Sequence, residues 1–338
     1  MRDLVDRLAR RRPFLVFMLM GSYSIQSLLI TISKQQVAYS DNVAVLLAEL
    51  LKLIFAVVMM PPEVRTSMTS GNPADFLRRL VHALPYAVPA ALYTLQNGLV
   101  FKALQKISPP QYQLLNNMKL FTTSVVFRIV MQRPMRVVQW WALMLLSLGM
   151  ALATAPCGAA EALQVNVKDI EQGIFIMMAV SLCSAVAGVL NEWLIKKSAN
   201  VLEANTWLYG FGVLAALYPL VSEDGLKPAA LLQGFTTSYL PWSVVLCNAI
   251  LGQSIAFLFR YADSIVKLYA VSAAMGFTSL YSSIFLEFTL TFHSACGYLV
   301  SFFSMGLYYM PGELLNSTDS ELLKAQLGEP LKKESKQA

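Results

Sequence analysis

Pairs of aromatic and amide side chains recur in stretches that are otherwise apolar. They are spaced i, i+4, so that a helix would place each pair on one face: Tyr93 with Asn97, Tyr112 with Asn116, and Asn205 with Tyr209. Gln96 stands beside the first pair, and Lys119 continues the stripe of the second. An aromatic ring can stack on a nucleobase while an amide one turn away hydrogen-bonds its edge. Alternatively, amides join helices and tyrosines mark the membrane interface, but three pairs with a lysine favour a ligand site.

Two lysines lie where lipid or helix contacts are expected. Lys119 is near the middle of an apolar stretch, and Lys267 is a few residues into another. A lysine at the membrane centre costs roughly 2.5–3.5 kcal/mol on insertion scales, so each should face a cavity or a partner. Two converging ammonium groups would suit a phosphate-bearing solute. The alternative is snorkelling to the surface, which is easier for Lys267 than for Lys119.

Two further charged pairs have intrahelical spacing. Glu49 and Lys52 are at i, i+3, and Glu192 is four residues before Lys196, so both pairs could form ion pairs on a helix. For the Glu49 pair, structural neutralisation and substrate contact both stay open.

Catalytic and metal-binding patterns are missing from the sequence. It contains no P-loop, HExxH or GxSxG motif, so we expect no enzyme activity and no cofactor. Cys183, Cys247 and Cys296 lie in apolar stretches, Cys157 lies in a short loop, and none has metal-ligand spacing. We interpret the cysteines as small packing residues.

The elements that position these residues are long apolar stretches. Of the 338 residues, 56% are hydrophobic and 14% charged, against about 25% charged in soluble domains. A crossing needs roughly 20 apolar residues. The sequence predicts an all-α membrane protein with ten transmembrane helices, at about 14–33, 42–61, 83–102, 109–130, 137–155, 172–191, 205–221, 240–259, 264–286 and 289–309.

The basic residues indicate how these spans are oriented. Five arginines precede residue 13, and further basic residues recur in alternate loops, including Lys196 and Lys197, and in the tail. The positive-inside rule therefore places both termini in the cytosol. The net charge of +6 is explained by topology, and nothing in it indicates a nucleic-acid partner.

Ten spans divide into two halves of five. We expect a basic cytosolic N-terminus (1–13), a first half (14–155), an acidic lumenal loop (156–171), a second half (172–309) and a polar cytosolic tail (310–338). Halves with an odd number of spans have opposite orientations, so a repeat would be inverted, with the solute near the midplane. Lys119 and Lys267 fall in matching spans, the fourth and the ninth.

Five segments, in order, resemble the motifs of one known family. AVLLAELLKL is similar to a TE-x-x-KL stretch, and PAALYTLQNGLVFKAL to P-S-x-x-Y-x-x-QNN-x. YQLLNNMKLFTTS stands where relatives have YQVTYQLK. CSAVAGVLNEWLIKKS resembles CSG-x-AGVY-x-E, and RYADSIVKLYA resembles KY-x-D-x-x-x-K. Through these segments the chain resembles the nucleotide-sugar transporter family of the drug/metabolite transporter superfamily, in the branch with the CMP-sialic acid, UDP-galactose and UDP-N-acetylglucosamine transporters.

The resemblance implies a ten-helix fold with inverted five-helix repeats, in the Golgi or ER membrane. It also implies exchange of a cytosolic nucleotide sugar for lumenal nucleoside monophosphate. Lys119 and Lys267 would bind phosphate, and Glu49 and Lys52 would lie near the cavity. The residues around the nucleotide would be Tyr93, Asn97, Tyr112, Asn205 and Tyr209.

Departures from the family pattern bear on the substrate. Asn116 and Asn117 replace a Tyr-Gln pair, and Gly98 replaces the second Asn of QNN. The YTLQN sequence favours a UDP-sugar, with CMP-sialic acid next. Two alternatives stay open: a same-fold exporter of another phosphorylated metabolite, and a non-transporting scaffold or regulator. The oligomeric state, monomer or homodimer, stays open too.

Overall fold

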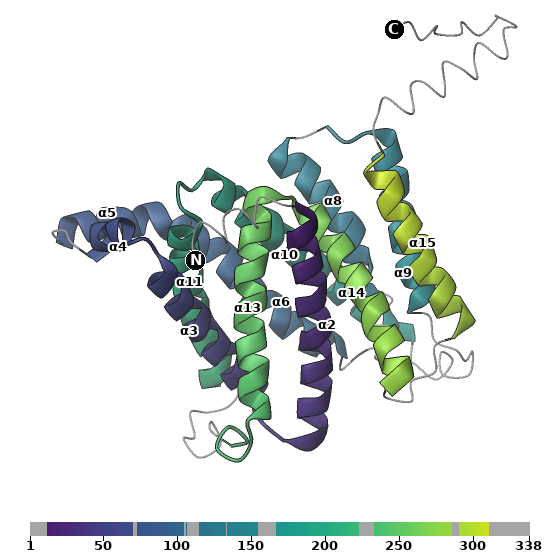
Figure 1. Ribbon diagram of the computed structural model, residues 1–338, viewed down its shortest axis with the longest axis horizontal. Helices are drawn as coiled ribbons and strands as arrows, with labels where there is room; N and C mark the ends of the chain where they lie inside the picture. The colour runs from purple at the N-terminus through teal and green to yellow at the C-terminus, as the bar shows by residue number, and fades with distance from the viewer. Residues whose placement is uncertain are drawn as a thin grey trace, which may run out of the picture.

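The computed structural model describes residues 12–69, 73–104, 106, 115–132, 134–154, 167–222, 233–285 and 291–310, and the regular elements in these ranges are helices (Figure 1). The long helices are α2 (Arg12–Gln36), α3 (Asp41–Met59), α6 (Ala87–Leu104), α8 (Met118–Met131), α9 (Val137–Ala153), α10 (Val167–Lys197), α11 (Val201–Ser222), α13 (Leu240–Tyr261), α14 (Ser264–Phe285) and α15 (Phe292–Tyr308). The short ones are α4 (Pro62–Thr69), α5 (Pro73–Ala83) and η1 (Leu84–Tyr86).

Within the described residues, four helices are long and apolar enough to cross a bilayer: Asp41–Met59, Glu171–Lys197, Val201–Ser222 and Leu240–Tyr261. Each predicted apolar stretch coincides with a long helix, although the ends differ. α10 runs to Lys197 because its last turns are polar and pair along the helix, where an apolar window stops early. α8 begins only at Met118. The elements in the described part of the chain are thus helical, as expected for a multi-pass membrane protein.

Two sets of three helices make up the centre of the molecule. α2 packs against α13 and α14, and we call these three the α2 set. α10 packs against α6 and α8, which together form the α10 set. α3 and α11 contact each other. α3 also contacts α13 of the α2 set, whereas α11 contacts both sets, through α6 and α10 of one and α13 of the other. Figure 1 shows α2 between α13 and α14.

α9 and α15 form a close pair at one side of the molecule (Figure 1). Their approach depends on two glycines, since a Cβ on Gly149 would lie 2.8 Å from the carbonyl oxygen of Gly297, and one on Gly297 would meet the backbone nitrogen of Ala153. Ser304 Oγ donates to the carbonyl oxygen of Ala142 at 2.6 Å. Small residues and a buried hydroxyl are the usual means of joining helices in lipid.

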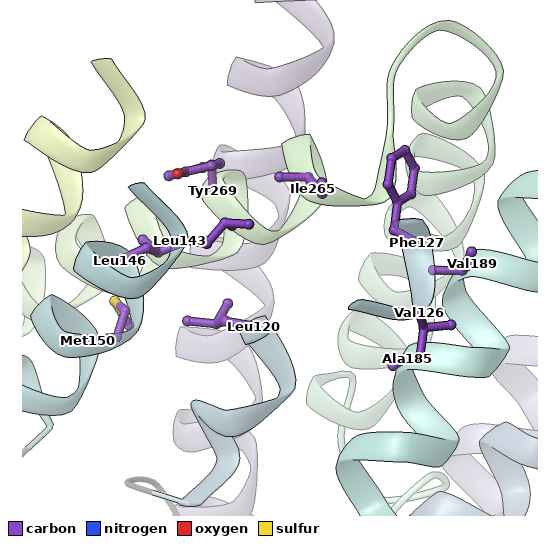
Figure 2. Packing of buried hydrophobic residues seen from close by; sticks show 10 residues of the cluster. All are labelled: Leu120, Val126, Phe127, Leu143, Leu146, Met150, Ala185, Val189, Ile265 and Tyr269. Carbon is purple, nitrogen blue, oxygen red and sulfur yellow. The ribbon is translucent and has the colours of Figure 1, made fainter. Parts of the chain in front are cut away.

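The largest apolar cluster surrounds α8, which carries Lys119. Figure 2 shows Leu120 of α8 beside Leu143 of α9, while Val126 of α8 lies near Val189 of α10. Ile265, near the start of α14, joins the same cluster. Packing on several sides fixes α8 relative to α9, α10 and α14 and so sets the place of its first turn.

Candidate substrate site

Lys119 and Lys267 lie on the first turns of α8 and α14, two helices that contact each other. Both side chains are partly buried. Neither has an ion-pair or hydrogen-bond partner among the residues that the structure describes, although Lys267 Nζ lies 5.5 Å from the centre of the Phe259 ring. The two ammonium groups are close enough to repel each other electrostatically. Two unpaired, mutually repelling cations form a site that an anion would stabilise.

The predicted Glu49–Lys52 ion pair is present on α3. Lys52 Nζ lies 2.5 Å from Glu49 Oε1, and it also lies 5.3 Å from the centre of the Tyr209 ring on α11. Space for the carboxylate comes from Gly212, where a Cβ would lie 2.8 Å from Glu49 Oε2. Gly252 of α13 makes the same kind of room, with its Cβ position 2.5 Å from Lys52 Cδ. The pair is thus enclosed between α11 and α13.

Gln253 of α13 connects two of the predicted site residues. Its Nε2 donates to the carbonyl oxygen of Lys52 at 2.9 Å, and its Oε1 accepts from Asn205 Nδ2 at 3.2 Å. Sequence reasoning missed this residue. The sequence did offer one signal for a functional role: Gln253 is a polar residue in the middle of the apolar stretch 240–259.

Tyr93 of α6 faces the same group of polar side chains. Its hydroxyl is hydrogen-bonded by Asn191 of α10, and it lies within electrostatic range of Glu49 and Tyr209. Tyr23 of α2 is also within range of Tyr93. Residues from α2, α3, α6, α10, α11 and α13 therefore meet at one polar centre, to which sequence reasoning had assigned neither Asn191 nor Tyr23.

Three amide oxygens on α6, α10 and α11 have unmet hydrogen-bonding capacity. Gln96 Oε1, Asn191 Oδ1 and Asn205 Oδ1 are buried and lack a hydrogen-bond partner within the described chain. A buried acceptor without a partner costs about 1–3 kcal/mol. Donor groups on a ligand, such as an exocyclic amine, a ring N–H or a sugar hydroxyl, would remove that cost.

The remaining predicted residues stand apart from this centre. Asn97 is exposed on α6. Asn116 comes just before α8 begins, so its predicted stripe with Lys119 is interrupted by the turn at Asn117. Tyr112 lies outside the described residues. Asn117 has a structural contact, because its Nδ2 donates to Thr154 Oγ1 at the end of α9, at 3.2 Å.

Comparisons with known proteins show which family the chain is similar to. A family model described as "Nucleotide-sugar transporter" matches residues 13–309. The chain is 30% identical over 301 residues to CMP-sialic acid transporter 1 of Oryza sativa subsp. japonica, covering 86% of this chain and 92% of that protein. It is 29% identical over 301 residues to CMP-sialic acid transporter 1 of Arabidopsis thaliana, covering 86% and 88%.

A solved protein crystal structure also superposes on the chain, with a TM-score of 0.65, and covers 88% of this chain and 96% of that one. At 10% sequence identity, this likeness shows the fold alone. The family match is of a different kind, since it spans every long helix described above and names a class of transporters rather than enzymes. The chain belongs to the nucleotide-sugar transporter family.

Proposed function

We propose that this protein is an antiporter that moves a pyrimidine nucleotide sugar from the cytosol into the Golgi or ER lumen in exchange for the nucleoside monophosphate. The observation that carries the proposal is that Lys119 and Lys267, on two helices in contact, lie within electrostatic range of each other and have no acidic partner within the described chain. Phosphate would neutralise both ammonium groups. A nucleotide sugar and its monophosphate share this group, so one site can bind both in turn.

The polar centre supplies contacts for the rest of the nucleotide. Tyr93 and Tyr209 offer aromatic faces, and the unpartnered oxygens of Gln96, Asn191 and Asn205 accept hydrogen bonds. We favour a UDP-sugar such as UDP-galactose or UDP-N-acetylglucosamine because of the YTLQN sequence. CMP-sialic acid is the second candidate, and the names of the curated relatives favour it.

Helix packing supports the inverted repeat that such a mechanism needs. Exchanging α2, α3, α6, α8 and α9 with α10, α11, α13, α14 and α15 turns the α2–α13 and α2–α14 contacts into the α10–α6 and α10–α8 contacts. The α3–α11, α8–α14 and α9–α15 contacts map onto themselves. We propose two inverted five-helix halves, with both termini cytosolic, that rock to expose the central site to either side.

A nucleotide panel tests the proposal. UMP, CMP, GMP and AMP are each added to the purified protein, and the melting temperature is measured. We expect stabilisation by UMP or CMP, and none by the purine nucleotides. Stabilisation by phosphorylated metabolites but by no nucleotide would point to the same-fold exporter. If no phosphorylated solute raises the melting temperature, the protein is better described as a scaffold.

A further inference from the structure

A buried carboxylate that the proposed substrate site does not use lies near the end of α10. Glu192 is fully buried, and its Oε1 accepts a hydrogen bond from Lys196 Nζ at 2.5 Å, which confirms the pair predicted from spacing. Its Oε2 accepts from the backbone nitrogen of Ser264 at 2.7 Å and from Ser264 Oγ at 2.5 Å. Ser264 is the first residue of α14, so Glu192 satisfies an amide that has no partner within its own helix. A negative charge is also favourable at a helix N-terminus.

Other charged residues complete this connection. Lys196 Nζ also lies 2.6 Å from Asp263 Oδ1. Arg260 of α13 also bonds to the end of α10. Its Nη1 donates to backbone carbonyl oxygens there, including that of Ser198 at 2.8 Å. The end of α10 and the turn between α13 and α14 are thus joined by bonds from both sides. We call Glu192, Lys196, Asp263 and Ser264 the α10–α14 latch.

The latch joins helices that otherwise pack in different sets. α10 belongs to the set that includes α8 and therefore Lys119, whereas α13 and α14 pack on α2 and carry Lys267 (Figure 1). Lys267 follows Ser264 by three residues, on the first turn of α14. The bonds of Glu192 therefore set how the two lysine-bearing helix sets meet at this end of the molecule.

We propose that Glu192 is a positioning residue of the transport cycle: its bonds to Lys196 and Ser264 hold the α10 set against the α2 set while the α10–α14 end is closed, and they break when that end opens. The proposal rests on the proposed alternating access. By the basic residues around it, this end is the cytosolic one. A buried ion pair is in general weak evidence for stability, since apolar residues of similar volume often do as well, but it can specify one arrangement of helices over another.

The distance between the two helix sets tests this role without any substrate. Spin labels are placed at Phe17→Cys on α2 and Ala199→Cys directly after α10, two exposed positions that report on the α2 set and the α10 set, in full-length protein whose four native cysteines are replaced. Distance distributions are measured by pulsed EPR in nucleotide-free proteoliposomes. Glu192→Gln removes the charge that Lys196 contacts. Ser264→Ala removes one donor and keeps the backbone bond, so that it serves as the milder variant if Glu192→Gln folds poorly.

Ser304→Ala is the matched control. Ser304 Oγ also makes buried hydrogen bonds, to the carbonyl oxygen of Ala142 on α9 and with the hydroxyl of Tyr269 on α14, but both start from α15 and neither joins the α10 set to the α2 set. We expect each latch variant to raise the ratio of long to short distances, by about tenfold for Glu192→Gln, while Ser304→Ala leaves the ratio unchanged. The double variant of Glu192 and Ser264 should shift the ratio by less than the product of the two single shifts, because the residues bond each other.

Unchanged distances in both latch variants, or an equal shift in Ser304→Ala, would overturn the proposal. Nucleotide-induced stabilisation, measured on the same proteins, should persist in Glu192→Gln, because Glu192 lies outside the substrate site; its complete loss in a folded variant would also contradict a positioning role. If the distances shift as expected but no nucleotide stabilises the unsubstituted protein, the latch stands and the proposed substrate class fails.

Discussion

Replacing Lys267 with methionine should stabilise the empty protein and weaken its response to nucleotide. The substitution keeps a long flexible side chain. It removes a charge that has no acidic partner in the described chain and that lies within electrostatic range of Lys119. On insertion scales a central lysine costs roughly 2.5–3.5 kcal/mol. This is an upper limit for Lys267, because its side chain is only partly buried. We expect the nucleotide-free Lys267→Met protein to gain about 1 kcal/mol in stability.

The effect on binding has the opposite sign. A hydrogen bond to a charged group contributes about 1.5–3 kcal/mol, so Lys267→Met should weaken nucleotide binding about 10- to 150-fold. At a nucleotide concentration of 100 times Kd, the unsubstituted protein gains about 2.7 kcal/mol, and a tenfold weaker variant gains about 1.4 kcal/mol. Melting temperatures with and without UMP and CMP measure both effects on one sample.

Lys102→Met is the matched control, because Lys102 is an exposed lysine in the last turn of α6. It should change neither the melting temperature of the empty protein nor the shift caused by nucleotide. The reasoning is refuted if Lys267→Met destabilises the empty protein and keeps the full nucleotide shift, since Lys267 would then be a structural residue with a favourable environment.

Two pairs of glycine substitutions test the packing around the site. Gly212→Ala should lower nucleotide exchange with little loss of stability, because the new Cβ displaces the flexible carboxylate of Glu49. The Cβ of Gly210→Ala, on the same helix, meets open space, so this variant should leave exchange unchanged. Gly297→Ala should destabilise the protein by about 3 kcal/mol, because its Cβ meets α9 backbone that cannot move aside, whereas Gly306→Ala has open space and should be neutral in a thermal unfolding assay. Equal effects within either pair would contradict these contacts.

Local patterns predicted those features that depend on one helix alone. Apolar windows located the long helices because burial in lipid requires apolar residues along a whole segment. Spacing within a helix predicted the pair of Glu49 and Lys52 and that of Glu192 and Lys196, and both ion pairs are present. The predicted helix ends were less accurate than the predicted helices themselves, because an apolar window does not detect capping residues or polar last turns.

Contacts between helices could not be predicted from spacing. Gln253 bonds to α3 and α11, and Ser264 bonds to α10, only because those helices happen to pack together. The closeness of Lys119 and Lys267 was an exception, because counting spans in each half had already put them on matching helices. The binding roles of these residues, including Tyr112, stay predictions.

Exchange in proteoliposomes tests the central claim most directly. Vesicles containing the purified protein are loaded with UMP or CMP, and uptake of labelled UDP-sugar or CMP-sialic acid is followed. We predict uptake that requires the matching internal monophosphate and that is abolished by Lys119→Ala and by Lys267→Ala in folded protein. Uptake that is independent of internal nucleotide, or normal exchange by both lysine variants, would contradict the account.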